Sequence, residues 1–131
     1  MNVFIVEVEN RAGQLSRIVT ALGSAGVNIT TGAGLGLSDS GGFGFVTDDE
    51  NGARQALNAA SIMFKTVPVV GAMVPNAAGG LAQAARKLAG AGVNVQFVAP
   101  MAMRGQDTVV VFGVDDAAAA KAALGELAAD V

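Results

Sequence analysis

The stretch Ala25-Gly26-Val27-Asn28-Ile29 recurs 66 residues later as Ala91-Gly92-Val93-Asn94-Val95, and this repeat decides how the chain folds. An earlier segment, Asn10-Arg11-Ala12-Gly13-Gln14-Leu15, is matched at the same offset by Asn76-Ala77-Ala78-Gly79-Gly80-Leu81. Further along, the offset becomes 67, so that Phe45 matches Phe112 and Asp48-Asp49 matches Asp115-Asp116. Four matches in the same order indicate a tandem duplication, with one repeat expected over residues 1–66 and the second over 67–131.

Each copy alternates between the period of a strand and that of a helix. Apolar side chains alternate from Asn2 to Glu9, which predicts a half-buried strand. In copy one a helix is expected next, capped by Asn10 and ended by Gly23 and Gly26. One face of this helix should be buried, and so should the matching face in copy two: Leu15, Ile18, Val19 and Leu22 in copy one, and Leu81, Ala84, Ala85 and Leu88 in copy two. Copy one should continue with strands over 27–35, 43–47 and 61–66, a turn over 38–42 and a helix capped by Asp48. Copy two should have strands over 69–74, 93–99 and 108–114, helices over 78–91 and 116–128 and a turn at 104–106.

The order βαββαβ is that of the split βαβ, ferredoxin-like unit, an antiparallel sheet with two helices on one face. The expected fold class is therefore α+β, with two ferredoxin-like units in tandem. Copy two has only residues 128–131 left for its last strand, so this strand is expected to be missing or vestigial. We expect a partner chain or the other copy to cover the strand edge that this leaves open.

The composition restricts the chemistry available to the chain. Its 131 residues include no Cys, His, Trp or Tyr, which excludes disulfides and thiolate metal sites and removes the commonest general base. We therefore expect no enzyme activity and no cofactor. A formal charge of −3 without a basic segment argues against binding to nucleic acid or to a membrane surface. Residues 1–11 lack the basic start and the cleavage site that are typical of a signal peptide, and no apolar run approaches the ~18 residues of a membrane span, so we expect a cytoplasmic protein.

Charged residues make up only 15% of the chain, below the roughly 25% usual for soluble domains. Two interpretations fit this low value, either an unusually apolar small fold or a surface that is hidden in an oligomer. We expect a homodimer.

The recurring residues gather at the corner before the first helix and at the start of the second strand, and we expect these two points to be neighbours. A glycine in the first helical turn lets an anion such as a carboxylate approach backbone N–H groups at the positive end of the helix dipole. An asparagine at the strand start both donates and accepts hydrogen bonds, so it suits an ammonium group and a carboxylate oxygen.

In these motifs the chain resembles the ACT-domain family, small regulatory modules that often bind amino acids. The resemblance covers nearly the whole chain as two ACT units in tandem. In that family the ligand commonly lies at an interface between two units, held by the loop that enters the first helix and by the Asn-bearing second strand. The resemblance implies a ligand set of Asn10, Arg11, Ala12, Gly13, Gln14, Leu15, Asn28 and Ile29 in copy one, with Asn76, Gly79, Gly80, Leu81, Asn94 and Val95 in copy two. The chain departs from the family pattern where Ala12 and Ala78 replace the usual Pro, and where Ala77 replaces the Arg of copy one.

The function implied is that of a non-catalytic amino-acid-binding regulatory protein, a sensor whose regulated partner would be a separate protein. The alternative is a ligand-free oligomerisation or interaction module that acts through protein–protein contacts. In that case the recurring residues only shape the fold.

Each candidate residue also has a purely structural interpretation. Asn10 and Asn76 suit helix N-caps, Gly13 and Gly79 permit close packing of helix on sheet, and Asn28 and Asn94 suit bonds to local backbone after a turn. The acidic residues at 48–50 and 115–116 resemble the ligand cluster of a divalent-metal site, but their position at helix starts favours helix capping. The glycines at 32, 34 and 36 mimic a dinucleotide fingerprint, yet they end a strand and do not open a helix.

Overall fold

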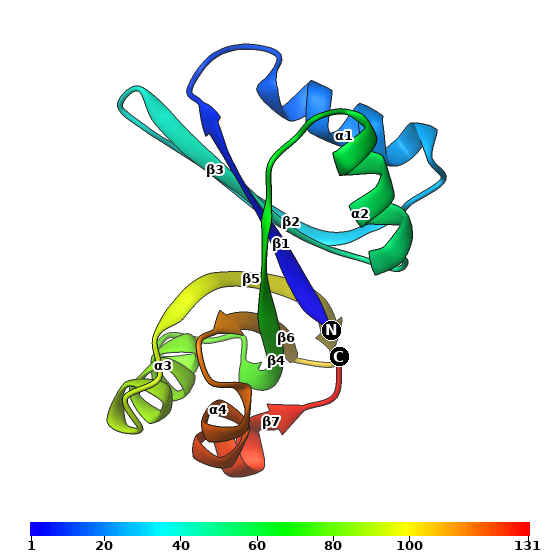
Figure 1. The fold of residues 1–131 in the computed structure, drawn as a ribbon. Helices are drawn as coiled ribbons and strands as arrows, with labels where there is room; N and C mark the ends of the chain where they lie inside the picture. Colours follow the sequence, from blue (N-terminus) through cyan, green and yellow to red (C-terminus); the bar gives the residue numbers. More distant parts are fainter. The chain divides into compact units, whose positions relative to one another are not determined.

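The computed structural model describes residues 1–131, and the chain divides into two compact units. Asn2–Thr66 form the N-terminal unit, and Val67–Val131 together with Met1 form the C-terminal unit. The elements follow the order β-α-β-β-α-β twice when β4, which passes from the first unit into the second, is counted as the last strand of the first run and the first strand of the second (Figure 1). The structure confirms the α+β class and this order of elements.

The N-terminal unit has a sheet in the order β2-β3-β1, covered by two helices. The strands are β1 (Asn2–Glu9), β2 (Ile29–Leu37) and β3 (Ser40–Thr47), and the helices are α1 (Gln14–Ser24) and α2 (Glu50–Ala59). The ring of Phe4 lies 5.5 Å from that of Phe45 and 5.4 Å from that of Phe64, so aromatic packing joins β1 to β3 and to the segment after α2. The buried core consists of Phe4, Val6, Ile18, Leu22, Val27, Phe45, Ala53, Leu57 and Ile62.

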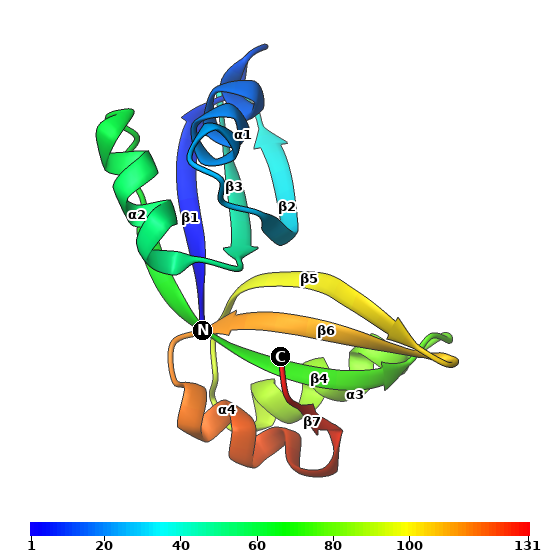
Figure 2. The ribbon, with the colours of Figure 1, turned by 90° about the vertical axis from the view of Figure 1, so that its right-hand side faces the viewer.

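The C-terminal unit has a sheet in the order β5-β6-β4, and its two helices lie on one face of that sheet (Figure 2). Its elements are β4 (Lys65–Pro75), α3 (Gly80–Gly90), β5 (Val95–Arg104), β6 (Asp107–Val114) and α4 (Ala117–Leu124). No helix of either unit is long and apolar enough to cross a membrane. The core is built mainly from valine, alanine and leucine: Val70, Ala72, Val74, Ala84, Leu88, Val93, Val110, Phe112, Val114, Ala120 and Leu124.

The junction of the two copies differs from the prediction. Separate strands were expected over 61–66 and 69–74, whereas the structure has the single continuous strand β4. The residues before β4 form a turn in which Ser61 has a φ of 56° and Ile62 is buried in the core. A short apolar run such as 62–64 has the same pattern in a strand and in a loop that packs on the core, and for this reason the prediction was wrong here. Smaller differences are that α1 continues past Gly23 to Ser24 and that β3 begins at 40, before the expected 43.

The C-terminus of the chain is also more broken than predicted. The helix expected over 116–128 ends at Leu124, and the 3₁₀ turn η1 (Gly125–Leu127) follows. Ala128–Ala129 form β7, a two-residue strand that pairs with Gly71 and Ala72 of β4. A vestigial last strand is therefore present. The cover expected from a partner chain or from the other copy is supplied at these two positions by the unit's own C-terminal residues.

The second helix of each unit begins at an aspartate cap. Asp49 accepts a hydrogen bond from the backbone N–H of Gly52 at 2.9 Å, and Asp116 accepts one from Ala119 at 2.9 Å. The prediction that Asp48 caps α2 was wrong by one residue, because its carboxylate bonds instead to a backbone N–H of the sheet. Capping thus accounts for one aspartate of each acidic pair.

Thr47, the last residue of β3, is a buried polar side chain without a partner. It is 6% exposed, and its hydroxyl makes no hydrogen bond. Val114 occupies the matching position at the end of β6 and is fully buried in the C-terminal core. Since an unpaired buried hydroxyl costs about 1–3 kcal/mol of desolvation, Thr47 weakens the core of the N-terminal unit.

Thr47→Val is therefore expected to raise the free energy of unfolding by about 1 kcal/mol, because it removes the unpaired hydroxyl at nearly constant volume. Val114→Thr should lower it by a similar amount. Urea denaturation of the two variants measures both changes. A destabilised Thr47→Val variant would contradict the assignment of an unsatisfied hydroxyl.

Candidate functional site

The loops that enter the first helix of each unit share a left-handed glycine. Gly13, the N-cap of α1, has a φ of 93°, and Gly79, the N-cap of α3, has a φ of 86°. A Cβ on either glycine would meet no atom within 4 Å. The glycines are thus required by their positive φ, and the interpretation that they permit close packing of helix on sheet is wrong. They leave open space in front of the first helical turn.

The first and second helices of each unit differ in how they begin. The first main-chain bond of α1 runs from the N–H of Arg17 to the carbonyl of Gly13 at 3.0 Å, so the N–H groups before it lack a helical acceptor. No side chain caps α1 or α3, whereas a carboxylate caps α2 and α4. The first helices therefore present a positive end that suits an anionic group from outside the chain.

Asn10 and Asn76 are not the N-caps that the structural interpretation suggested. The backbone N–H of Asn10 donates to the carbonyl of Asp39 at 2.9 Å, and its side-chain Nδ2 donates to the carbonyl of Ser38 at 2.9 Å. The backbone N–H of Asn76 makes the corresponding bond to the carbonyl of Gln106 at 3.1 Å. These bonds attach each entry loop to the adjacent hairpin turn, which explains part of the recurrence of asparagine at positions 10 and 76.

The polar side chains at the two entry loops differ. Arg11 Nε lies 2.8 Å from Glu9 Oε2 in an exposed ion pair. When the amide of Gln14 is oriented with its oxygen toward the guanidinium, this oxygen accepts a hydrogen bond from Arg11 Nη2 at 3.0 Å. In the C-terminal unit Ala77 takes the place of the arginine. Gly80 takes that of the glutamine and is buried against the backbone of β4. Of the two entry loops, therefore, only the N-terminal one carries a charged side chain.

Leu15 and Leu81 lie in the first helical turns and are 56% and 49% exposed. The prediction that they belong to the buried stripes was wrong, and so was that for Ala85, which is also exposed. In α1 the buried residues begin at Ile18, and in α3 the first buried side chain is that of Ala84, which follows the buried Gly80. Two leucines that the cores do not need thus lie beside the open helix starts, and the exposed Ala12 and Ala78 precede the glycines.

Asn28 and Asn94 precede β2 and β5, and both are exposed. The N–H of Asn28 donates to Asp48 Oδ1 at 3.0 Å, and the N–H of Asp48 donates to the carbonyl of Asn28 at 3.1 Å. Asn94 and Asp115 repeat both bonds at 3.0 Å and 3.3 Å. The main chain of each asparagine is satisfied, while its side-chain amide has no hydrogen bond, so local backbone bonding does not explain the choice of side chain. The next residues differ, because Ile29 packs against the N-terminal core whereas Val95 is 37% exposed.

The entry loop and the strand start do not lie together within one unit. β1 and β2 are both antiparallel to β3 and hence parallel to each other. Glu9 lies opposite Ser40 and Ile29 lies opposite Thr47, at the two ends of β3. The 11 residues of α1, about 16 Å of helix, run between these ends (Figure 1). The prediction that the two points are neighbours was wrong for a single unit, and the register of β4, β5 and β6 gives the same separation in the C-terminal unit.

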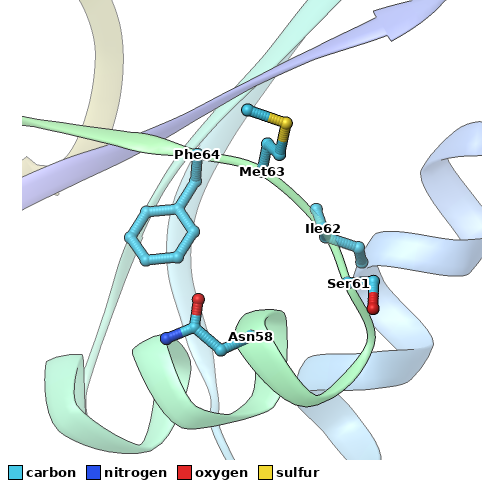
Figure 3. A pocket seen from close by; sticks show the side chains of 5 residues that line it. All are labelled: Asn58, Ser61, Ile62, Met63 and Phe64. Carbon is cyan, nitrogen blue, oxygen red and sulfur yellow. The ribbon is translucent and has the colours of Figure 1, made fainter.

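A shallow hollow of about 430 Å³ lies after α2 and contains none of the predicted site residues. Asn58 points toward the ring of Phe64, and Ser61, Ile62 and Met63 line the turn beside them (Figure 3). Sequence reasoning missed this hollow because it placed a strand over 61–66, and because Ser61 has a positive φ where no glycine or asparagine indicates one. No charged group lines the hollow, which makes it a poor site for a zwitterion.

The glycine-rich segment at 32–36 lies within β2 and opens no helix, as expected of a strand rather than of a dinucleotide-binding loop. A Cβ at Gly36 would lie 2.8 Å from Asn10 Oδ1. This glycine therefore makes room for the side chain that fastens the entry loop.

Comparison with known proteins gives the fold but not the family. No family model matches the chain, and no curated protein matches its sequence. A solved structure of a protein from Bacteroides thetaiotaomicron is similar with a TM-score of 0.78 and 22% identity, over 95% of this chain and 86% of that chain. The regulatory subunit of aspartate kinase from Thermus thermophilus, in its ligand-free form, is similar with a TM-score of 0.65 and 16% identity, over 96% and 91% of the two chains. That from Thermus flavus has a TM-score of 0.66 and 14% identity, over 96% and 90%. At such identities the likeness is one of fold: this chain has the fold of regulatory subunits of aspartate kinase, which supports an ACT-like architecture.

Proposed function

We propose that this chain is a non-catalytic regulatory protein of two ACT repeats, residues 1–66 and 67–131, that binds an amino acid. The observation that carries the proposal is the start of the first helix in both units, which is left without a cap and opened by Gly13 and Gly79. The shared fold with regulatory subunits supports a regulatory role. In this proposal the regulated partner is a separate protein.

The carboxylate of the amino acid binds at the start of α1, in the role that the carboxylate of Asp49 has at α2. Each charge-assisted hydrogen bond there contributes about 1.5–3 kcal/mol before the costs of binding. Two or three such bonds fit a dissociation constant in the micromolar to millimolar range, which suits a sensor of a metabolite pool. The exposed Leu15 offers an apolar contact beside the same helix start.

The amide of Asn28 holds the ammonium group and the second carboxylate oxygen, since it both donates and accepts. Because Asn28 lies at the far end of its own unit from Gly13, a complete site combines the entry loop of one chain with the strand start of a second copy of the chain. This agrees with the interface position that the resemblance to ACT domains implies, and a homodimer supplies such pairs of units. The proposed second set consists of Asn76, Gly79, Gly80, Leu81, Asn94 and Val95, and it lacks counterparts of Arg11 and Gln14.

A thermal-shift screen of the twenty amino acids at about 10 mM each tests amino-acid binding. A ligand at 100 times its dissociation constant stabilises the folded state by about 2.7 kcal/mol, which raises the midpoint by several degrees. We expect one amino acid, or a few of related chemistry, to produce this rise. If none does, the proposal is contradicted for amino acids, and a ligand-free oligomerisation module, favoured by the exposed Leu15 and Leu81, takes its place.

Gly13→Ala is expected to abolish most of the thermal shift, because a side chain at positive φ distorts the loop and fills the space before α1. The variant should also lose about 1 kcal/mol of stability from the backbone strain. Gly105→Ala is the matched control, since Gly105 has a φ of 63°, its Cβ would also meet no atom within 4 Å, and it is not a proposed ligand residue. Equal loss of binding in both variants would show that strain alone, and not the helix start, explains the effect.

Asn28→Ala is expected to remove the thermal shift while changing the free energy of unfolding by less than about 0.5 kcal/mol. The physical reason is that the amide is exposed and unbonded in the unliganded fold, so its removal leaves no buried group without a partner. Asn94→Ala measures the same effect in the second repeat. Binding that persists unchanged in a double variant would exclude both asparagines from the site.

A further inference from the structure

The strands that follow Asn28 and Asn94 each have an irregular pairing close to their start. In β2 the pairing passes from Ile29 opposite Thr47 to Thr31 opposite Val46, which leaves one extra residue in the strand. β5 has the same irregularity two residues after its asparagine, where the pairing passes from 95 opposite 114 to 97 opposite 113. Such bulges bend a strand and change the direction of nearby side chains, and they are frequent beside functional sites.

One aspartate in each unit holds the strand start at the position of the asparagine. The carboxylate of Asp48 accepts from the N–H of Asn28 at 3.0 Å, and the main-chain N–H of Asp48 donates to the carbonyl of Asn28 at 3.1 Å, so both main-chain groups of Asn28 are satisfied. Asp115 does the same for Asn94. After these bonds, the side-chain amide is the only polar group of each asparagine that remains available.

This carboxylate does not serve the helix that follows it. The next residue in each unit caps that helix, through Asp49 in α2 and Asp116 in α4. The two adjacent aspartates therefore have separate partners, one in the helix and one in the sheet. Helix stability explains the second aspartate but not the first.

We propose that Asp48 and Asp115 are positioning residues, which fix the backbone of Asn28 and Asn94 so that each side-chain amide is oriented for a ligand. The inference rests on the proposed function, which gives the asparagines their ligand. It assigns to the aspartates a role in affinity that exceeds their role in stability. The bonds to the backbone are exposed, so their loss changes the free energy of unfolding little, whereas a mobile Asn28 must be ordered again on binding.

The test compares Asp48→Ala, Asp48→Asn and the control Asp130→Ala, which removes the same charge from an exposed position near the C-terminus. The first readout is amide hydrogen exchange at Asn28 in the unliganded protein, which needs no ligand. We expect exchange about tenfold faster in Asp48→Ala and near wild type in Asp48→Asn, whose amide oxygen still accepts. The second readout is the thermal shift produced by an equimolar mixture of the twenty amino acids, which Asp48→Ala should reduce by at least about half and Asp48→Asn should retain.

The outcomes separate this inference from the proposed function. A normal wild-type shift that is equally large in Asp48→Ala overturns the positioning role alone, and so does unchanged exchange at Asn28. A wild-type protein that the mixture does not stabilise overturns the proposed function, whatever the exchange shows. If Asp48→Ala fails to fold, Asp48→Ser replaces it in both readouts, because serine keeps a shorter hydrogen-bond acceptor. A thermal shift that falls in Asp48→Ser but not in Asp48→Asn then supports the inference.

Discussion

The packing of α1 back along the sheet between two parallel strands is the constraint on which the arrangement of each unit depends. A unit of about 65 residues buries only about 60% of the surface that its unfolded chain exposes, so it needs α1 over the sheet. Ile18 and Leu22 of this helix pack with Phe4 and Phe45 in the core. With α1 in this direction, the open helix start and the start of β2 must lie at opposite ends of the unit. A ligand that contacts both points would have to bring together two copies of the chain, so that its binding would be coupled to association.

The two units resemble each other more closely in their hydrogen bonds than in their side chains. The bonds from asparagine to aspartate at the strand starts are 3.0 Å long in both units, and the helix-cap bonds are 2.9 Å long in both. The entry loops diverged, with Gln14 in one and the buried Gly80 in the other. Thr47 and Val114 show a similar divergence in the cores. The two proposed sites thus have a common backbone frame and different side chains, so they are expected to bind the same amino acid with different affinities.

The fold class and most helices and strands could be predicted from the sequence. The alternating and helical spacing of apolar residues, and the repetition of this spacing in the second copy, indicate which side chains are buried within each short segment. The prediction failed where the partner of a residue lies far along the chain. Asn10 has the appearance of a cap, but its side chain bonds to Ser38, 28 residues away. Choosing between the adjacent Asp48 and Asp49 as the cap depends on backbone angles that neither residue type determines. The separation of the entry loop from the start of β2 follows from strand direction, which no local pattern encodes.

The two aspartates after β3 show why positioning and stability need not be measured by the same experiment. Asp49 bonds to an N–H three residues away in its own helix, a local cap whose removal costs about 1 kcal/mol. Asp48 reaches across 20 residues of sequence to a backbone N–H that water would otherwise solvate, so its bond contributes little to the balance between folded and unfolded chains. What this bond changes is the number of conformations open to Asn28 within the folded state. A residue of this kind is almost invisible to denaturation, and it becomes visible only when the amide that it orients has a partner to bind.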